Sequence, residues 1–213
     1  LARQLQPLGP WMKVGLELLL HAGPSVVRAL REMGMPVFLD GKFHDIPNTV
    51  AGAVRGAAAA GAGILNVHAS GGLRMMRAAR AAVEGMTSRP LVIGVTVLTS
   101  LAPEELRDEA GVARPLDAQA LALAQLARRA GLDGVVASVA ETAAIKAACG
   151  RDFVVITPGI RPAPAEDDQR RVATPRAALA AGADFLVVGR PITQAPDPAA
   201  ACATILDEMA GAR

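Results

Sequence analysis

Short apolar runs rich in β-branched residues recur along the chain, and a longer segment rich in alanine and arginine follows most of them. The runs are apolar throughout instead of alternating with polar residues, which is typical of parallel strands covered by helices on both faces. This pattern predicts seven strands, at residues 11–16, 36–40, 63–69, 91–98, 134–138, 153–157 and 185–189.

The segments between the runs predict helices, and several of them end in glycine, the usual residue after a last helical turn. These predicted helices lie at 24–34, 48–62, 72–85, 116–131, 141–150 and 174–183. Strands that alternate with helices predict an α/β fold, and we expect a (β/α)8 TIM-type barrel that forms one domain over residues 1–213.

A closed barrel of this type needs eight strands, whereas the pattern predicts only seven. Residues 1–9 resemble the end of a helix with no strand before it, so we expect the first strand of the barrel to be missing from this chain. An open seven-stranded sheet is the alternative.

Two connections are longer than the roughly two to six residues usual between a strand and its helix. Residues 99–117 follow the fourth strand, and we expect a short extra helix at 103–110. Residues 158–175 follow the sixth strand and are rich in proline, glycine and charge. A long polar loop at this place is typical of an active-site lid, with a tolerated surface insertion as the alternative.

The composition, 52% apolar and 20% charged residues, favours an ordered globular protein. A net charge of +2 with only 2% aromatic residues argues against nucleic-acid binding. Neither a run of about 20 apolar residues nor a signal-peptide core occurs, so we expect a cytoplasmic protein. Cys149 and Cys202 lack metal-ligand spacing and are expected to be buried, reduced thiols.

Lysine is rare in this chain, because only three of its 22 basic residues are lysines: Lys13, Lys42 and Lys146. Where arginine supplies the surface cations, a lysine at a strand end suggests chemistry, since an ammonium group can release a proton. Lys13 lies on the first predicted strand and Lys42 follows the second. These two lysines are therefore candidate site residues.

The densest group of charges lies at residues 38–49. Side chains alternate along a strand, so Asp40 and Lys42 should point to the same side while Gly41 faces away. Asp45 follows, and Pro47 ends the strand, so that Asn48 or Thr49 can cap the next helix. An ion pair with a helix cap is the purely structural alternative. The second cation at Lys13 favours a functional site.

Polar and glycine residues also follow the later strands. Gly189 and Arg190 end the last strand, where backbone N–H groups and a guanidinium group can bind a phosphate. Arg161 and Gln169 in the preceding loop could close over the same ligand. Other candidates at strand ends are His68, Thr99, Ser100 and Pro158.

The segment FLDGKFHDIPNTV (38–50) resembles the signature of the orotidine 5′-phosphate decarboxylases, with its Asp-x-Lys-x-x-Asp core. The segments KVGLELL, VTVLTSL, TPGIRP, DDQRRVATP and GADFLVVGRPIT match that family in the same order, over essentially the whole chain. Two features depart from the family. Gly41 replaces a larger apolar residue, and the first strand, which carries a ribose-binding aspartate in the family, has no counterpart.

The resemblance implies decarboxylation of orotidine 5′-monophosphate to UMP, the last step of de novo pyrimidine synthesis, without a metal or cofactor. It implies a network of Lys13, Asp40, Lys42 and Asp45, in which Lys42 protonates C6 of the pyrimidine. It also implies a homodimer in which Asp45 and Thr49 reach the neighbouring site. The substrate-binding residues that it implies are Ile46, Pro47, Asn48, Thr49, Thr99, Ser100, Pro158, Arg161, Gln169, Gly189 and Arg190.

Two alternatives remain open. A related sugar-phosphate barrel, such as a hexulose-phosphate synthase or a keto-gulonate-phosphate decarboxylase, shares the Asp-x-Lys-x-x-Asp core but resembles enzymes with metal-dependent enolate chemistry. The IPNT, LTS and DDQR segments favour orotidine chemistry instead. The second alternative is a non-catalytic barrel that binds a phosphorylated ligand.

Overall fold

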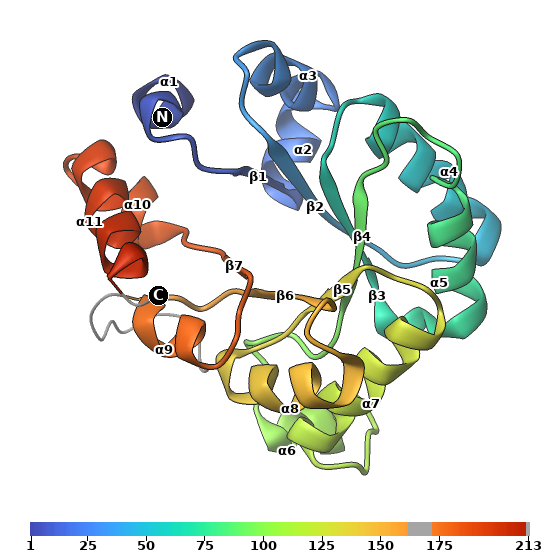
Figure 1. Ribbon diagram of the computed structural model, residues 1–213. Helices are drawn as coiled ribbons and strands as arrows, with labels where there is room; N and C mark the ends of the chain where they lie inside the picture. The colour runs from blue at the N-terminus through green and yellow to red at the C-terminus, as the bar shows by residue number, and fades with distance from the viewer. Residues whose placement is uncertain (162–171, 212–213) are drawn as a thin grey trace. The chain divides into compact units, whose positions relative to one another are not determined.

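The computed structural model describes residues 1–161 and 172–211 (Figure 1). The chain divides into two compact units. The first unit comprises Leu1–Val95 and Leu126–Gly134, and the second comprises Thr96–Gln125 and Val135–Arg213. Over the described residues, no helix is long and apolar enough to cross a membrane.

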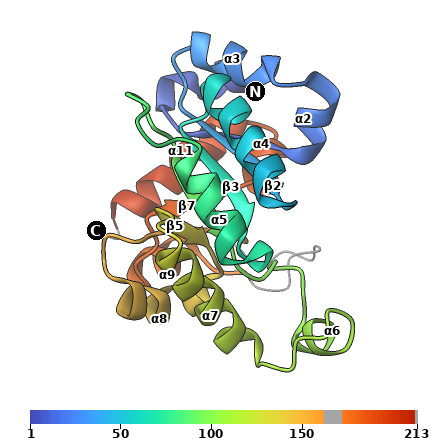
Figure 2. The same ribbon diagram turned by 90° about the vertical axis from the view of Figure 1, so that its right-hand side faces the viewer.

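Four parallel strands form the sheet of the first unit and pair in sequence order. Most residues of β2, β3 and β4 are buried, as continuous apolar runs predict, whereas in β1 only Val14 is buried. Helices α4 and α5 lie side by side outside this sheet (Figures 1 and 2). The strands are β1 (Met12–Gly15), β2 (Val37–Phe43), β3 (Ile64–His68) and β4 (Leu91–Val95), and the helices are α1 (Ala2–Leu5), α2 (Leu16–Ala22), α3 (Ser25–Glu32), α4 (Pro47–Ala59) and α5 (Gly72–Ala81).

The second unit contains the later strands, and β6 pairs in parallel with β7. Ile160, Ala178 and Ala183 form a buried apolar cluster, against which Leu186 of β7 packs. Its strands are β6 (Val154–Thr157) and β7 (Phe185–Leu186), and its helices are α6 (Pro103–Asp108), α8 (Val139–Cys149), α9 (Pro175–Ala180), α10 (Arg190–Thr193) and α11 (Pro198–Ala210). Strand β5 (Gly134–Val136) and helix α7 (Leu116–Arg129) contain residues of both units.

All seven predicted strands are present, and the α/β class with parallel strands in sequence order is confirmed. The helix end at the start of the chain and the extra helix in the 99–117 connection are confirmed as α1 and α6. Cys149 and Cys202 are buried and form no disulfide within the part of the chain described. The prediction of one domain over residues 1–213 stays a prediction.

Some local predictions are wrong. The first strand ends at Gly15 instead of Leu16, and a helix that the pattern did not predict, α2, begins there. The cap of α4 is Ile46 rather than Asn48 or Thr49. Pro47 occupies the first helical position, where its fixed φ and missing N–H cost nothing, so the helix begins earlier than the polar residues suggest.

Aspartates fix the starts of two strands. The Asp133 carboxylate forms a two-point ion pair with the Arg89 guanidinium (2.7 and 2.8 Å), and it accepts the backbone N–H of Val92 at 2.8 Å. In the second unit, the Asp184 carboxylate accepts the backbone N–H of Val155 at 2.7 Å and the Lys146 ammonium at 2.6 Å. Each aspartate thus satisfies a backbone donor at the beginning of a neighbouring strand.

Candidate active site

Strand β2 contains a bulge at the position of the predicted charge cluster. Leu39 pairs with Leu65, but the next paired residue is Phe43, which lies opposite Val67. Strand β2 therefore advances four residues where β3 advances two, and it accommodates two extra residues. Within the bulge Lys42 has φ = 47°, the only positive φ among the non-glycine residues that the structure describes. Such a conformation is strained for a residue with a side chain.

Two ammonium groups share one carboxylate at the ends of β1 and β2. The Lys42 Nζ lies 2.6 Å from Oδ1 of Asp40, and the Lys13 Nζ lies 3.1 Å from Oδ2. The Asp40 side chain is only 12% exposed, whereas the two lysine side chains are 36% and 29% exposed. The carboxylate is thus buried beneath two more accessible cations. The cluster carries one excess positive charge.

The electrostatics of Asp40 keep it ionised. Burial by itself raises the pKa of this carboxyl, but Lys13 and Lys42 oppose burial through their positive charges. Together with hydrogen bonds from Lys42 and Asn66, they lower the pKa of Asp40 below its ordinary value. The carboxylate therefore accepts hydrogen bonds only, and it fixes the positions of both ammonium groups.

Asn66 is a further residue of this cluster, and the sequence analysis did not single it out. It lies on β3 and is fully buried. Its Nδ2 donates to Oδ1 of Asp40 at 2.7 Å, and its Oδ1 accepts the backbone N–H of Lys42 at 2.7 Å. A signal was present in the sequence, because Asn66 is a polar residue in the middle of a largely apolar predicted strand.

Two histidines border the cluster. The rings of His44 and His68 lie with their centroids 5.4 Å apart and are tilted by 35°. Burial, followed by electrostatic interactions with His44 and Lys42, lowers the pKa of His68 below its ordinary value, although Asp40 opposes this. His68 is therefore neutral at physiological pH and adds no charge to the cluster.

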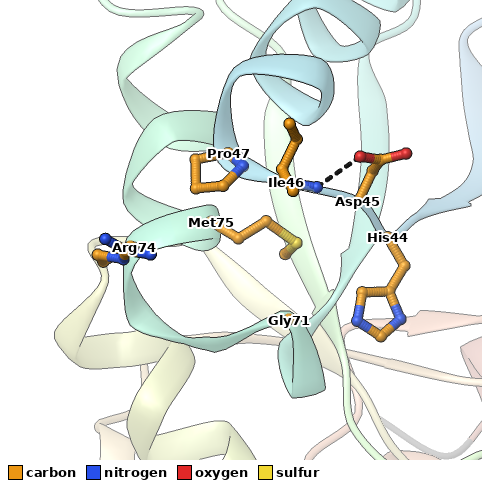
Figure 3. A pocket seen from close by; sticks show the side chains of 7 residues that line it. All are labelled: His44, Asp45, Ile46, Pro47, Gly71, Arg74 and Met75. Atoms are coloured by element: carbon orange, nitrogen blue, oxygen red, sulfur yellow. Dashed lines mark hydrogen bonds between the residues drawn. The ribbon is translucent and has the colours of Figure 1, made fainter.

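Asp45 does not join the cluster within this chain. Its carboxylate is exposed, and Oδ1 accepts the backbone N–H of the next residue, Ile46, at 2.6 Å (Figure 3). Ile46 is 67% exposed. Asp45 and Ile46 border a hollow of about 510 Å³, whose other lining residues are His44, Pro47, Gly71, Arg74 and Met75. Asn48 and Thr49 are exposed at the start of α4.

The predicted ligand-binding residues of the second unit lie at or just after strands. Thr99 is buried and Ser100 exposed in the turn beyond β4, and Pro158 directly follows β6. Gly189 is the N-cap of α10, and Arg190 is its first residue, half-buried, so both follow the end of β7 by a few residues.

Backbone hydrogen bonds join the two ends of the long predicted loop, residues 158–175. The backbones of Ile160 and Ala173 form a parallel bridge, with Arg161 N–H donating to Ala173 O at 2.9 Å. The Arg161 side chain is buried, and its Nη1 donates to Ile160 O at 2.9 Å. Gln169 lies outside the residues that the structure describes.

The prediction that Gly41 faces away from the cluster stays a prediction. A β-carbon built on Gly41 would lie 2.7 Å from the ring of Phe43, so a larger residue would displace that ring rather than the charged groups. In contrast, a β-carbon on Gly15 would lie 3.0 Å from Nζ of Lys13. Among the described residues, no group of three or more His, Cys, Asp or Glu side chains is arranged to ligate a metal ion.

Comparison with known proteins extends over nearly the whole chain. The family model described as "Orotidine 5′-phosphate decarboxylase / HUMPS family" matches residues 1–205. An orotidine 5′-phosphate decarboxylase of Teredinibacter turnerae is 54% identical over 98% of this chain and 90% of that protein. One of Nitratidesulfovibrio vulgaris is 56% identical over 95% of this chain and 85% of that protein. The crystal structure of orotidine 5′-phosphate decarboxylase from Lactobacillus acidophilus superposes with a TM-score of 0.82 at 40% identity, covering 92% of this chain and 85% of that one.

Proposed function

The chain belongs to the orotidine 5′-phosphate decarboxylase / HUMPS family, and on this basis we propose that it decarboxylates orotidine 5′-monophosphate to UMP. The family resemblance expected from the sequence motifs is confirmed. The predicted TIM-type fold of this chain is also confirmed, because it matches the fold of solved orotidine 5′-phosphate decarboxylases. The observation that carries the chemistry is the pair of ammonium groups that share the buried Asp40 carboxylate.

The reaction needs a site that stabilises negative charge on carbon. When the C6–carboxylate bond breaks, CO₂ leaves and the bonding electron pair stays at C6, where no adjacent carbonyl can accept it. A fixed cation in a pre-organised site can stabilise such a charge directly. The Lys42 ammonium, fixed by Asp40 at 2.6 Å, is suited to this role and then delivers a proton to C6. Solvent restores the proton on Lys42.

Asp40 has a second proposed role. With its lowered pKa it stays ionised, and it would lie near the carboxylate of the bound substrate. Repulsion between these two negative groups is relieved as CO₂ departs. Since ground-state repulsion of this kind is contested as a source of catalysis, stabilisation of the C6 carbanion is the larger of the two proposed contributions. Lys13, at 3.1 Å from Asp40, offsets part of the repulsion and permits binding.

We propose that the enzyme acts in the cytoplasm as a homodimer in which Asp45 serves the neighbouring site. Two observations in the first unit support this assignment. In the described chain the Asp45 carboxylate accepts a hydrogen bond from the backbone N–H of Ile46, and it pairs with neither lysine. The adjacent Ile46 is 67% exposed, so its apolar side chain is accessible to a partner surface. Thr49, exposed one turn further along, would accompany Asp45 across the interface.

The remaining substrate contacts are proposed from the family motifs. Thr99 and Ser100 would bind the edge of the pyrimidine, and Arg161, Gln169, Gly189 and Arg190 would hold the phosphate, with Gln169 also linking the long loop to the base. Ile46, Pro47, Asn48 and Pro158 would complete the walls around the ligand. Binding of a phosphate remote from C6 can lower the barrier by driving closure of the site over the substrate.

A spectrophotometric assay tests the proposed reaction directly. Purified protein should remove the absorbance of orotidine 5′-monophosphate, and added EDTA should leave the rate unchanged. The related sugar-phosphate chemistry of the same family predicts a different result, namely activity on a phosphorylated sugar that EDTA abolishes. A protein that binds UMP but leaves the absorbance constant would instead be a phosphate-ligand-binding barrel.

A further inference from the structure

The strained backbone of Lys42 requires a group that stabilises it. A left-handed conformation is strained for a residue with a side chain, and it persists only where the surroundings enforce it. The bulge also removes Lys42 from the regular pairing of β2 with β3, so its backbone N–H has no partner in the ladder. This N–H donates to a side chain instead, the Oδ1 of Asn66, at 2.7 Å.

Asn66 lies opposite the beginning of the bulge. Continuing the register from Leu39 and Leu65 by one residue would place Asn66 beside Asp40. From this position its amide reaches two targets at once, the Lys42 backbone and the Asp40 carboxylate, each at 2.7 Å. The carboxylate oxygen that accepts from Asn66 is also the one that accepts from Lys42 Nζ. One buried amide thus contacts the Lys42 backbone directly and the Lys42 ammonium through the Asp40 carboxylate.

The chemistry of the two targets fixes the orientation of the amide. The Lys42 backbone N–H can only donate, so it requires the Asn66 oxygen. The ionised Asp40 carboxylate can only accept, so it requires the Asn66 nitrogen. Among side chains of this length, only asparagine offers both groups: aspartate offers two acceptors, and leucine offers neither.

We propose that Asn66 is a positioning residue for the decarboxylation, which holds the Lys42 backbone in its left-handed conformation and orients the Asp40 carboxylate toward the Lys42 ammonium. This inference rests on the proposed function for its kinetic consequence, but its structural part stands without it. Asn66 touches neither C6 nor the departing carboxylate in this proposal, and it acts through its two neighbours. A displacement of about 1 Å at a reacting group can cost about 100-fold in rate.

Substitution of Asn66 tests the proposal. We expect Asn66→Ala to lower kcat about 100-fold with little change in KM, because substrate contacts remain while Lys42 is displaced. Loss of the amide donor should also raise the pKa of Asp40 and move the acid limb of the kcat–pH profile to higher pH. The charged and titratable groups that face Asp40 are Lys13, Lys42 and His68, and all three remain in the variant.

Asn66→Asp separates the two tasks. It keeps an acceptor for the Lys42 N–H but replaces the donor to Asp40 by a second carboxylate, so the acid limb should move further than in Asn66→Ala. Thr142→Val is the matched control, because Thr142 is equally buried and its hydroxyl donates to the Ser138 carbonyl at 3.0 Å, within helix α8. This control should keep the wild-type kcat and pH profile.

A measurement on the wild-type protein needs neither variant nor activity. The NMR signals of the Asn66 side-chain amide should follow the acid titration of the Asp40 carboxyl carbon. An amide that does not respond overturns the inference, as does a folded Asn66→Ala variant with wild-type kcat and an unmoved acid limb. Absence of orotidine 5′-monophosphate turnover in the wild type overturns the proposed function instead, and the NMR result still decides the role of Asn66.

Discussion

Basic side chains pair with aspartates both where strands end and where strands begin. The two arrangements differ in how many hydrogen-bond donors of the basic side chain have a partner. At the starts of β6 and β7, the Lys146 ammonium donates to the carbonyls of Arg151 and Phe153, each at 2.9 Å, and to the Asp184 carboxylate at 2.6 Å. All three of its donors are satisfied. The Arg89–Asp133 pair is likewise closed, with two parallel hydrogen bonds.

At the ends of β1 and β2, by contrast, the lysine donors are not all satisfied. Lys13 and Lys42 have only Asp40 as an ion-pair partner in the described chain, so most of their donors remain available. An excess positive charge near a buried carboxylate is a poor way to stabilise a fold, and it invites an anion. The same Lys–Asp distance of 2.6 Å thus belongs to a structural clamp in one region and to a candidate site in the other.

The sharpest test of this difference exchanges the two lysines for alanine in turn. Lys42→Ala should reduce kcat by about 10⁴-fold or more, because it removes both a general acid and a fixed cation. It should leave tight binding of UMP. Lys146→Ala should leave kcat near the wild-type value at temperatures where the protein is folded. The comparison fails if the two variants lose activity to a similar extent, or if Lys42→Ala retains near-normal turnover.

A smaller effect is expected at Arg190, a cation that follows a strand rather than preceding one. A charge-assisted hydrogen bond to a phosphate contributes about 1.5–3 kcal/mol, so Arg190→Ala should lower kcat/KM about 10- to 100-fold. Steady-state kinetics with orotidine 5′-monophosphate measures this. Lowered kcat/KM for the phosphorylated substrate but not for orotidine supports the phosphate role, and an unchanged kcat/KM removes Arg190 from the site.

The sequence predicted the sheet well, because most strands are largely buried and therefore largely apolar. It failed at α2, whose leucines give no helical pattern: no residue of α2 is buried, and Leu20 is 82% exposed. It also missed α11, although Asp197-Pro198 is a recognisable start, in which the Asp197 carboxylate accepts the N–H groups of Ala199 and Ala200.

Within the candidate site, residue types could be predicted but the backbone could not. Alternation placed Asp40 and Lys42 on one side, and their side chains do meet at 2.6 Å. The contact arises, however, in a bulge in which Lys42 has φ = 47°. The conformational preferences of lysine do not predict this positive φ. The need for Asn66 follows from that bulge. Tertiary pairing of β2 with β3, rather than local sequence, creates both features.

The structural clamp should affect stability instead of rate. Lys146→Met leaves the Asp184 carboxylate and two carbonyls without their donor, although the side chain of Asp184 is 36% exposed and water compensates in part. We expect the free energy of unfolding to fall by about 2 kcal/mol, and Tm by roughly 4–8 °C. Arg107→Met breaks an exposed ion pair with Asp108 and should produce no measurable change in thermal unfolding. Equal melting of the two variants contradicts the assignment of a clamp.

The smallest expected effect is a pH dependence of stability that arises from His68. This side chain is half-buried, and it lies near the excess positive charge of Lys13, Lys42 and Asp40. Because the pKa of His68 is lowered in the folded protein, the unfolded chain binds more protons between that pKa and about 6.5. Its contribution to stability is therefore complete above pH 6.5 and is lost as the pH falls through the lowered pKa. Urea unfolding of wild type and His68→Gln at pH 8 and pH 5 measures this, and the difference between the two pH values should be smaller in the variant. An equal or larger difference in His68→Gln would show that burial and the neighbouring cations do not disfavour protonation of this ring. The excess positive charge of the cluster of Lys13, Asp40 and Lys42 would then be compensated by other groups.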